Sequence, residues 1–259
     1  MNLPPPDAAF HWSREPWGAA LRCRGLEPAA QHLFTSKQLA LPDPESWRLV
    51  TASLGATPDR LMRVKQVHGN VVRVLKRGEV PADAAEQRPD GDAIVSNEAG
   101  LVLSVMVADC VPIVIVDPVR GAAAAIHAGW RGTSARVAPA AVAAMSREFG
   151  CRREDLRAAV GPSVGADDYE VGESLIDAFR DAGHAADDID RWFIRVRPRP
   201  HLDLWRANAD QLRQSGVDRD HIYICGLSTV SHTEIFESYR VDGERAGRMA
   251  ALVVVPRPA

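Results

Sequence analysis

The chain has 259 residues, of which 46% are hydrophobic and 25% are charged, and its formal net charge is -3. These values are typical of a globular protein with one large domain or two small ones. The nearly neutral charge gives no reason to expect a nucleic acid or an anionic membrane as a partner. No stretch approaches the roughly 18 consecutive apolar residues that a membrane-spanning helix needs.

The N-terminal residues 1–27 are rich in proline and contain Trp12 and Trp17. They predict an extended arm whose tryptophans pack on the rest of the molecule. No linker separates the later motifs, so residues 28–259 are expected to form a single catalytic domain.

Strand-like apolar runs dominate the first half of the chain, and helical spacing dominates parts of the second half. Runs of strands followed by helices, with short connections, predict an α+β fold and not a regular βαβ winding. Pro139 predicts a kink or a late start in the helical segment before Phe149. The basic segment Arg195–Arg199 and the acidic run Asp187–Asp190 are interpreted as solvated faces or loops. The expected strands are 61–67, 71–75, 93–96, 101–107, 113–117, 122–127, 158–160, 192–196, 221–225 and 252–255, and the expected helices are 140–149, 170–181 and 204–214.

Four scattered cysteines occur in the chain, and no disulfide framework is evident from their spacing. This usage is typical of reduced thiols, so we expect a cytoplasmic protein. The cysteines are Cys23, Cys110, Cys151 and Cys225.

Three side chains that can bind a metal follow apolar runs: His68, Cys110 and His127. Taken singly, each has a simpler interpretation: a turn histidine, a small buried hydrophobe and a histidine that caps a turn. Their spacings match no short metal-binding motif. Together, however, two imidazoles and a thiolate suit zinc, and three protein ligands leave the fourth position open, as in catalytic zinc sites.

The sequence around these three residues resembles the laccase-domain family, also called multicopper polyphenol oxidases. That family includes bacterial purine nucleoside phosphorylases and peptidoglycan-editing factors. The resemblance runs from about Gln31 to the C-terminus and rests on a Q-V-H-G block, an A-D-C-x-P block and an H-A-G-W-R-G block in this order. Further matches are Val160–Gly165, Tyr169–Gly172, Leu202–Trp205 and Phe236–Arg240.

The resemblance implies a single β-sandwich-like core of mixed sheets flanked by helices, with His68, Cys110 and His127 as metal ligands. Zinc is the expected cofactor, and copper is possible because it also binds imidazole and thiolate. The eight histidines include no His-x-His pair. This argues against a true copper laccase, which needs many paired histidines.

Further candidate site residues stand beside these ligands. Cys110, Asp109 and His127 are the catalytic candidates. Asp109 is either a proton acceptor, a turn residue or a hydrogen-bond partner of the ligand histidines. Arg131 is a candidate for contacting an anion such as phosphate, and Ser163 for contacting substrate. Arg240 binds either the phosphate of the substrate or a structural ion-pair partner.

Three positions depart from the family pattern, and they weaken any transfer of fine substrate preference. The chain has Phe34–Ser36 where the family has a threonine-arginine pair, and Gly226–Thr229 where it has Cys-Thr. Val241 replaces the second of two arginines. None of these positions is a proposed metal ligand.

The leading hypothesis is a zinc-dependent purine nucleoside phosphorylase that acts on adenosine, inosine or guanosine. Its expected partners are purine nucleosides and phosphate, and adenosine deaminase or methylthioadenosine phosphorylase activity is possible. One alternative is a peptidoglycan-editing amide hydrolase that removes L-serine from a UDP-linked cell-wall precursor. Others are a metal-free hydrolase in which Cys110 and His127 form an activated pair, and a copper polyphenol oxidase. The oligomeric state is left open.

Overall fold

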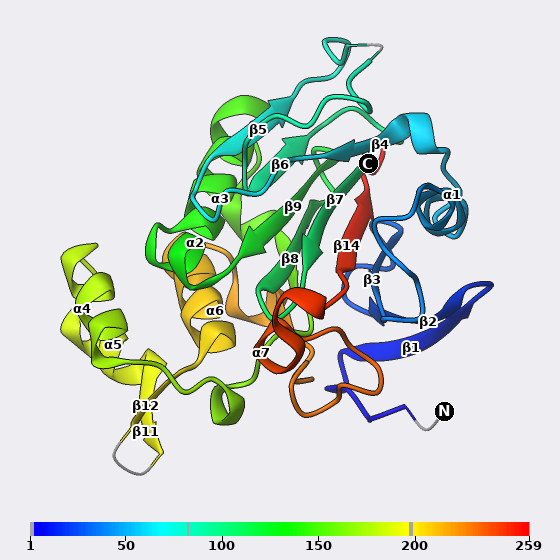
Figure 1. Ribbon diagram of the computed structural model, residues 1–259. Coiled ribbons are helices and arrows are strands. Elements are labelled where there is room, and N and C mark those ends of the chain that lie inside the picture. The colour runs from blue at the N-terminus through cyan, green and yellow to red at the C-terminus, as the bar shows by residue number, and fades with distance from the viewer. Residues whose placement is uncertain (1–2, 82, 197–198, 259) are drawn as a thin grey trace.

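The computed structural model describes residues 3–81, 83–196 and 199–258, and two six-stranded mixed sheets form its centre (Figure 1). The first sheet has the order β1 (Phe10–Glu15), β2 (Gly18–Cys23), β3 (His32–Thr35), β14 (Met249–Val254), β7 (Val102–Val107), β4 (Leu61–Arg63). The second has the order β13 (Ile222–Ile224), β10 (Arg157–Val160), β8 (Val111–Asp117), β9 (Ala122–Ala128), β6 (Ala93–Ser96), β5 (Val72–Leu75). A separate hairpin joins β11 (Phe193–Val196) to β12 (Arg199–Leu202).

Helices cover the outer faces of both sheets (Figure 1). Helix α1 packs on the first sheet, while α3 and α6 belong to the cluster that covers the second sheet. The helices are α1 (Pro44–Ala52), α2 (Trp130–Ser134), α3 (Val137–Phe149), α4 (Glu173–Asp181), α5 (Ala186–Trp192), α6 (Leu204–Gln214) and α7 (Tyr239–Asp242).

Strands β8 and β9 are buried on both faces, because one face meets the first sheet and the other meets the helices. Ile113 and Ile115 pack toward the helices, whereas Val114 and Val116 pack toward the first sheet, as the two-residue period of a strand requires. The first four residues of β9 are all alanine, and such small side chains let both neighbouring layers approach closely. The continuous apolar runs in the sequence therefore correspond to strands at the centre of the molecule.

These features confirm the expected α+β class and the single-domain, β-sandwich-like core flanked by helices. The break expected near Pro139 is also present. Helix α3 begins at Val137, after Arg136 in the left-handed region, and Pro139 lies in its first turn, where no intrahelical N–H is needed.

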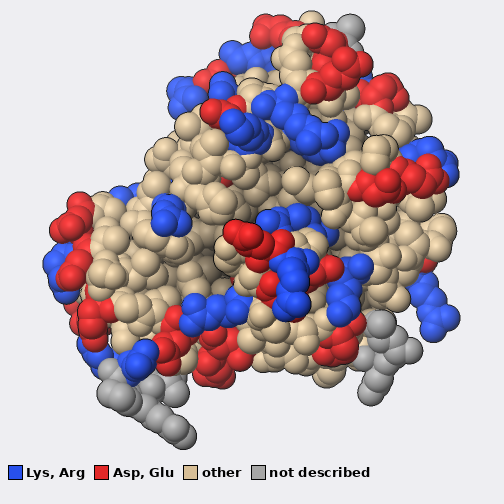
Figure 2. Space-filling view, in the orientation of Figure 1, with Lys and Arg blue, Asp and Glu red and all other residues tan. Residues whose placement is uncertain are grey.

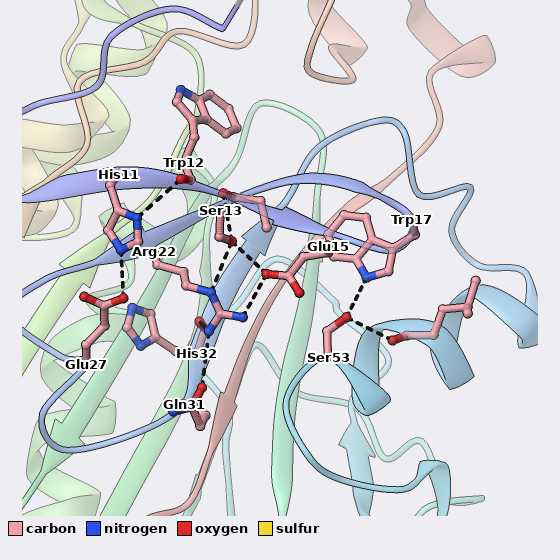
Figure 3. A network of polar contacts seen from close by, with 12 residues as sticks. His11, Trp12, Ser13, Glu15, Trp17, Arg22, Glu27, Gln31, His32 and Ser53 are labelled. Atoms are coloured by element: carbon pink, nitrogen blue, oxygen red, sulfur yellow. Dashed lines mark hydrogen bonds and ion pairs between the residues drawn. The ribbon is translucent and has the colours of Figure 1, made fainter.

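The N-terminal segment differs from the extended arm expected for residues 1–27. Strands β1 and β2 form an antiparallel hairpin, and β2 pairs with β3, so the segment is the edge of the first sheet. Figure 3 shows the polar contacts that fix it: Arg22 binds Glu15 and Ser13, and the Trp17 indole donates to Ser53. Proline residues concealed this hairpin because they flank its strands.

Four helices, α1, α2, α5 and α7, were absent from the sequence-based prediction. Helix α1 carries a recognisable start, because the Asp43 carboxylate accepts from Ser46 N–H and Pro44 occupies the first turn. The acidic run Asp187–Asp190 lies within α5, where Asp187 and Asp190 are exposed, so it is a solvated helix face, one of the two expected forms, and not a loop. Of the basic segment, Arg195 and Arg199 are exposed, as expected, whereas residues 197–198 lie outside the described residues. No helix in the described part of the chain is long and apolar enough to span a membrane.

Candidate metal centre

The loops and strand ends that carry His68, Cys110 and His127 meet at one end of the second sheet. His68 follows β4 in a loop, Cys110 occupies the turn between β7 and β8, and His127 is the penultimate residue of β9. One potential ligand atom from each residue lies within 4.8 Å of those of the other two. Residues 42 and 17 positions apart in the chain are thus brought together as the sequence predicted.

Strand pairing explains why Cys110 and His127 meet. In the antiparallel pair β8–β9, His127 lies opposite Pro112, so Cys110, two residues before Pro112, lies just beyond the end of β9. His68 reaches the same point from a tight turn in which its own φ is 61°. Its ring meets the His127 ring edge to face, with 4.8 Å between centroids.

Asp92 orients both histidines, and sequence reasoning missed it. Its Oδ1 lies 2.9 Å from His127 Nδ1 and also accepts the His68 N–H at 2.9 Å. Its Oδ2 accepts the Gly69 N–H at 2.7 Å. The carboxylate therefore makes Nδ1–H the donor and leaves His127 Nε2 for the centre, the arrangement in which metal-binding histidines are usually held.

Gly129 provides the space that the Cys110 sulfur occupies. A Cβ at this position would lie 2.7 Å from Cys110 Sγ, which is closer than any real contact of this kind. The glycine of the H-A-G-W-R-G block is thus required by close approach and not by an unusual backbone angle, since its φ of -72° is ordinary.

The electrostatics of the centre favour a charged pair. Burial alone raises the pKa of the Cys110 thiol, but hydrogen bonds to His127 and His68, together with their charge, lower it to about 6. Burial alone lowers the pKa of His127, but hydrogen bonds to Asp92 and Cys110 raise it to about 9. Without a metal, the pair is therefore a thiolate and an imidazolium near neutral pH.

Two pockets flank the three residues and share His68, Ala108, Cys110 and Tyr239. We call the smaller one the aromatic pocket; its volume is about 300 Å³, and it is also lined by Asp109, Gly129, Trp130, Arg131, Val164, Tyr169, Leu204 and Arg240. We call the larger one the basic pocket; its volume is about 750 Å³, and it is also lined by Val64, Lys65, Gln66, Arg88, Met106, Val107, His127 and Arg248.

The aromatic pocket contains two of the predicted substrate contacts. The Arg131 guanidinium lies 4.2 Å from the centre of the Trp130 ring. The Arg240 guanidinium lies 5.8 Å from the centre of the Tyr169 ring and donates to the Glu170 carbonyl. Both arginines are exposed, and neither forms an ion pair with a described residue, which was the other interpretation of Arg240.

Ser163 and Asp109 have surroundings that the sequence did not indicate, although Asp109 does lie in a turn, one of its expected roles. Ser163 is fully buried, and its neighbour Val164 lines the pocket instead. Asp109 lines the pocket, but its carboxylate accepts from Thr229 Oγ1 and from the Arg240 N–H, each at 2.6 Å. Asp109 was considered as the hydrogen-bond partner of the ligand histidines, but Asp92 has that position.

Comparison with known proteins identifies a family and several relatives. A family model described as multi-copper polyphenol oxidoreductase laccase matches residues 44–256. A purine nucleoside phosphorylase of Deinococcus radiodurans is 36% identical over 216 residues, which cover 83% of this chain and 78% of the relative. An adenosine deaminase, RL5, from an unknown prokaryotic organism is 37% identical over 201 residues, covering 75% of each chain. The crystal structure of YlmD from Geobacillus stearothermophilus superposes with a TM-score of 0.81 at 27% identity, covering 95% of this chain and 98% of that one.

Proposed function

The chain belongs to the multi-copper polyphenol oxidoreductase laccase family, and from this premise we propose that it is a zinc-dependent purine nucleoside phosphorylase. The observation that carries the proposal is the convergence of His68, Cys110 and His127, held by Asp92, where the aromatic pocket meets the basic pocket. The names of relatives such as the Deinococcus protein supply the substrate class. Adenosine, inosine and guanosine are the proposed substrates.

The donor set fits zinc. Two imidazole nitrogens and a low-pKa thiol are ligands that zinc prefers, and their spacing within 4.8 Å allows one ion to reach all three. When bound, zinc supplies a Lewis acid with one open coordination position. Copper would accept the same donors, so the metal content must be measured.

The residues of the aromatic pocket are proposed to bind the nucleoside. The Trp130 and Tyr169 rings offer flat apolar faces for a purine. Arg131 and Arg240, whose guanidinium groups lie over these rings, would contact polar atoms of the substrate. Both oxygens of Asp109 already accept hydrogen bonds, so we propose that it positions Arg240 and does not accept a proton.

A metal-free hydrolase is the second candidate, because the charged pair favours it. A thiolate beside an imidazolium is an activated nucleophile, and the lowered pKa of Cys110 gives that form at neutral pH. This candidate predicts activity that survives chelators and is abolished by alkylation of Cys110, the reverse of the zinc proposal.

The test measures metal content and nucleoside turnover on the same preparations of wild type and Cys110→Ala. The zinc proposal expects about one zinc per chain, lost together with activity in the variant. Phosphate dependence then separates phosphorolysis from the deamination named for the relative RL5. A metal-free protein that keeps full activity would contradict the zinc proposal. Zinc with no nucleoside turnover would contradict the phosphorylase and leave the cell-wall precursor as substrate.

A further inference from the structure

The basic pocket carries an excess of positive charge. Lys65, Arg88 and Arg248 line it, and no Asp or Glu is among its described lining residues. The aromatic pocket, in contrast, includes Asp109 beside its two arginines. Figure 2 shows Lys and Arg side chains above and below the hollow in the middle of this face, with Asp and Glu side chains beside the lower ones.

The three cations have donors available for a ligand. Arg88 is exposed and forms no ion pair with any described residue. Lys65 lies 3.6 Å from Asp90, but both side chains are largely exposed, so the pair holds the lysine weakly. Arg248 donates through Nη1 alone, to the carbonyls of Ala246 and Gly247.

A fourth cation adds to the local field without a counterion. The Arg63 guanidinium lies 4.7 Å from the centre of the Trp47 ring, outside the pocket lining, and its Nε and Nη1 are buried with no hydrogen-bond partner in the described structure. Burial, and then the nearby charge of Arg88, lower its pKa to about 10. Several positive groups, of which Lys65 alone has a carboxylate partner among the described residues, attract an anion to this side of the centre.

We propose that the basic pocket is the phosphate subsite of the enzyme, and that the nucleoside base binds in the aromatic pocket on the other side of His68 and Cys110. This inference rests on the proposed function. An in-line displacement requires the attacking group and the leaving group on opposite sides of the reacting carbon. We place the reacting carbon at the residues that the two pockets share, so that phosphate would approach from the basic pocket and the purine would leave into the aromatic pocket.

The reaction balances with these two substrates alone. A phosphate oxygen forms a bond to the anomeric carbon of the ribose as the bond from that carbon to the purine nitrogen breaks. The electron pair of the broken bond stays with the purine, which takes up a proton. Lys65, Arg88 and Arg248 orient the phosphate and offset its charge, which supplies the electrostatic part of catalysis. The products are ribose 1-phosphate and the free purine.

The test is binding of inorganic phosphate, measured by titration calorimetry on the metal-loaded protein, with Lys65→Gln and Arg88→Gln as variants. Loss of one charged hydrogen bond is expected to weaken phosphate binding about tenfold or more. The KM for phosphate rises by the same factor, while the KM for the nucleoside is unchanged. Arg88→Lys restores part of the affinity, because it keeps the charge.

Arg219→Gln is the matched control. Arg219 is exposed and lines a different groove, which also contains Arg191, Arg206 and Arg213 but includes the carboxylates of Asp203 and Asp210. This substitution removes one surface charge, as the test variants do, and is expected to leave phosphate binding unchanged.

The first outcome below distinguishes free phosphate from the phosphate of a nucleotide. The other two separate the subsite proposal from the phosphorylase proposal. If a nucleoside 5′-monophosphate, but not inorganic phosphate, binds in a manner that depends on Lys65 and Arg88, the subsite stands and its phosphate belongs to the substrate. If phosphate binds there and no nucleoside is converted, the phosphorylase proposal fails and the subsite stands. If nucleosides are phosphorolysed but both variants keep wild-type phosphate affinity and KM, the subsite proposal is overturned.

Discussion

His127 and His32 are both buried, yet their surroundings give them opposite protonation. His127 lies between a carboxylate and a thiol, and the Asp92 and Cys110 contacts raise its pKa to about 9. His32, in the first sheet beside the network of Figure 3, accepts the Cys23 N–H at Nε2 and reaches the Ala30 carbonyl with Nδ1. Two neutral partners satisfy a neutral ring, and burial lowers its pKa to about 4.

The comparison teaches that burial alone does not mark a functional histidine. The partners decide, because a nearby negative group stabilises the protonated ring whereas the Cys23 N–H donates to a ring nitrogen that must carry no proton. His127 is therefore suited to hold a metal or a substrate proton, and His32 to fix the hairpin edge of the first sheet. The following experiments separate the two roles, beginning with the largest expected effect.

Stability should fall in acid because of His32. The unfolded chain binds a proton at this residue below its ordinary pKa of 6.5, whereas the folded protein resists until about pH 4. Unfolding is thus favoured as pH falls through this window, by about 3 kcal/mol between pH 7 and pH 4. Urea unfolding at the two pH values measures the effect, and His32→Gln, which keeps a donor and an acceptor without titrating, should remove it. An equal loss in the variant would show that other groups cause the acid sensitivity.

Asp92→Asn should weaken the metal centre. The amide cannot accept from both Gly69 N–H and His127 Nδ1–H, so His127 loses its fixed orientation. We expect zinc affinity to fall about 10- to 100-fold, measured by competition with a chromophoric chelator. Asp59→Asn, at an exposed position away from the centre, is the control. Unchanged zinc affinity in Asp92→Asn would remove this residue from the site.

Cys110 should be the reactive thiol of the metal-free protein. With its pKa lowered to about 6, its rate of alkylation by iodoacetamide should fall about tenfold from pH 7 to pH 5. Cys23 and Cys225 are buried and have pKa values raised to about 11 and about 12, so they should not react in the folded protein. Cys110→Ser is the control that measures the background reaction of the other thiols. A midpoint near the ordinary thiol value of 9.0 would mean that the histidines do not stabilise the thiolate.

His11→Gln should have the smallest effect. His11 Nε2 lies 2.7 Å from Glu27 Oε1, but both side chains are partly exposed, and exposed pairs contribute little. We expect a change in unfolding free energy of less than about 0.5 kcal/mol and no change in zinc binding. A larger loss in urea unfolding would show that this pair holds the hairpin.

By itself, the sequence determined the α+β class, the central strands and the set His68, Cys110 and His127. Apolar runs and residue chemistry are local properties, and the family blocks carry them at recognisable positions. Local signals also gave the end of α6 at Gln214, just before Gly216.

Only the tertiary structure decided the rest. Asp92 binds His68 and His127 across 24 and 35 residues, and no spacing rule connects such positions. The hairpin of residues 10–23, the burial of Ser163 and the placing of Lys65, Arg88 and Arg248 around one pocket likewise depend on packing between distant segments. The chemistry of a side chain follows from its residue type. Its partners, and therefore its charge and its role, are determined only when the chain folds and the two sheets pack against each other.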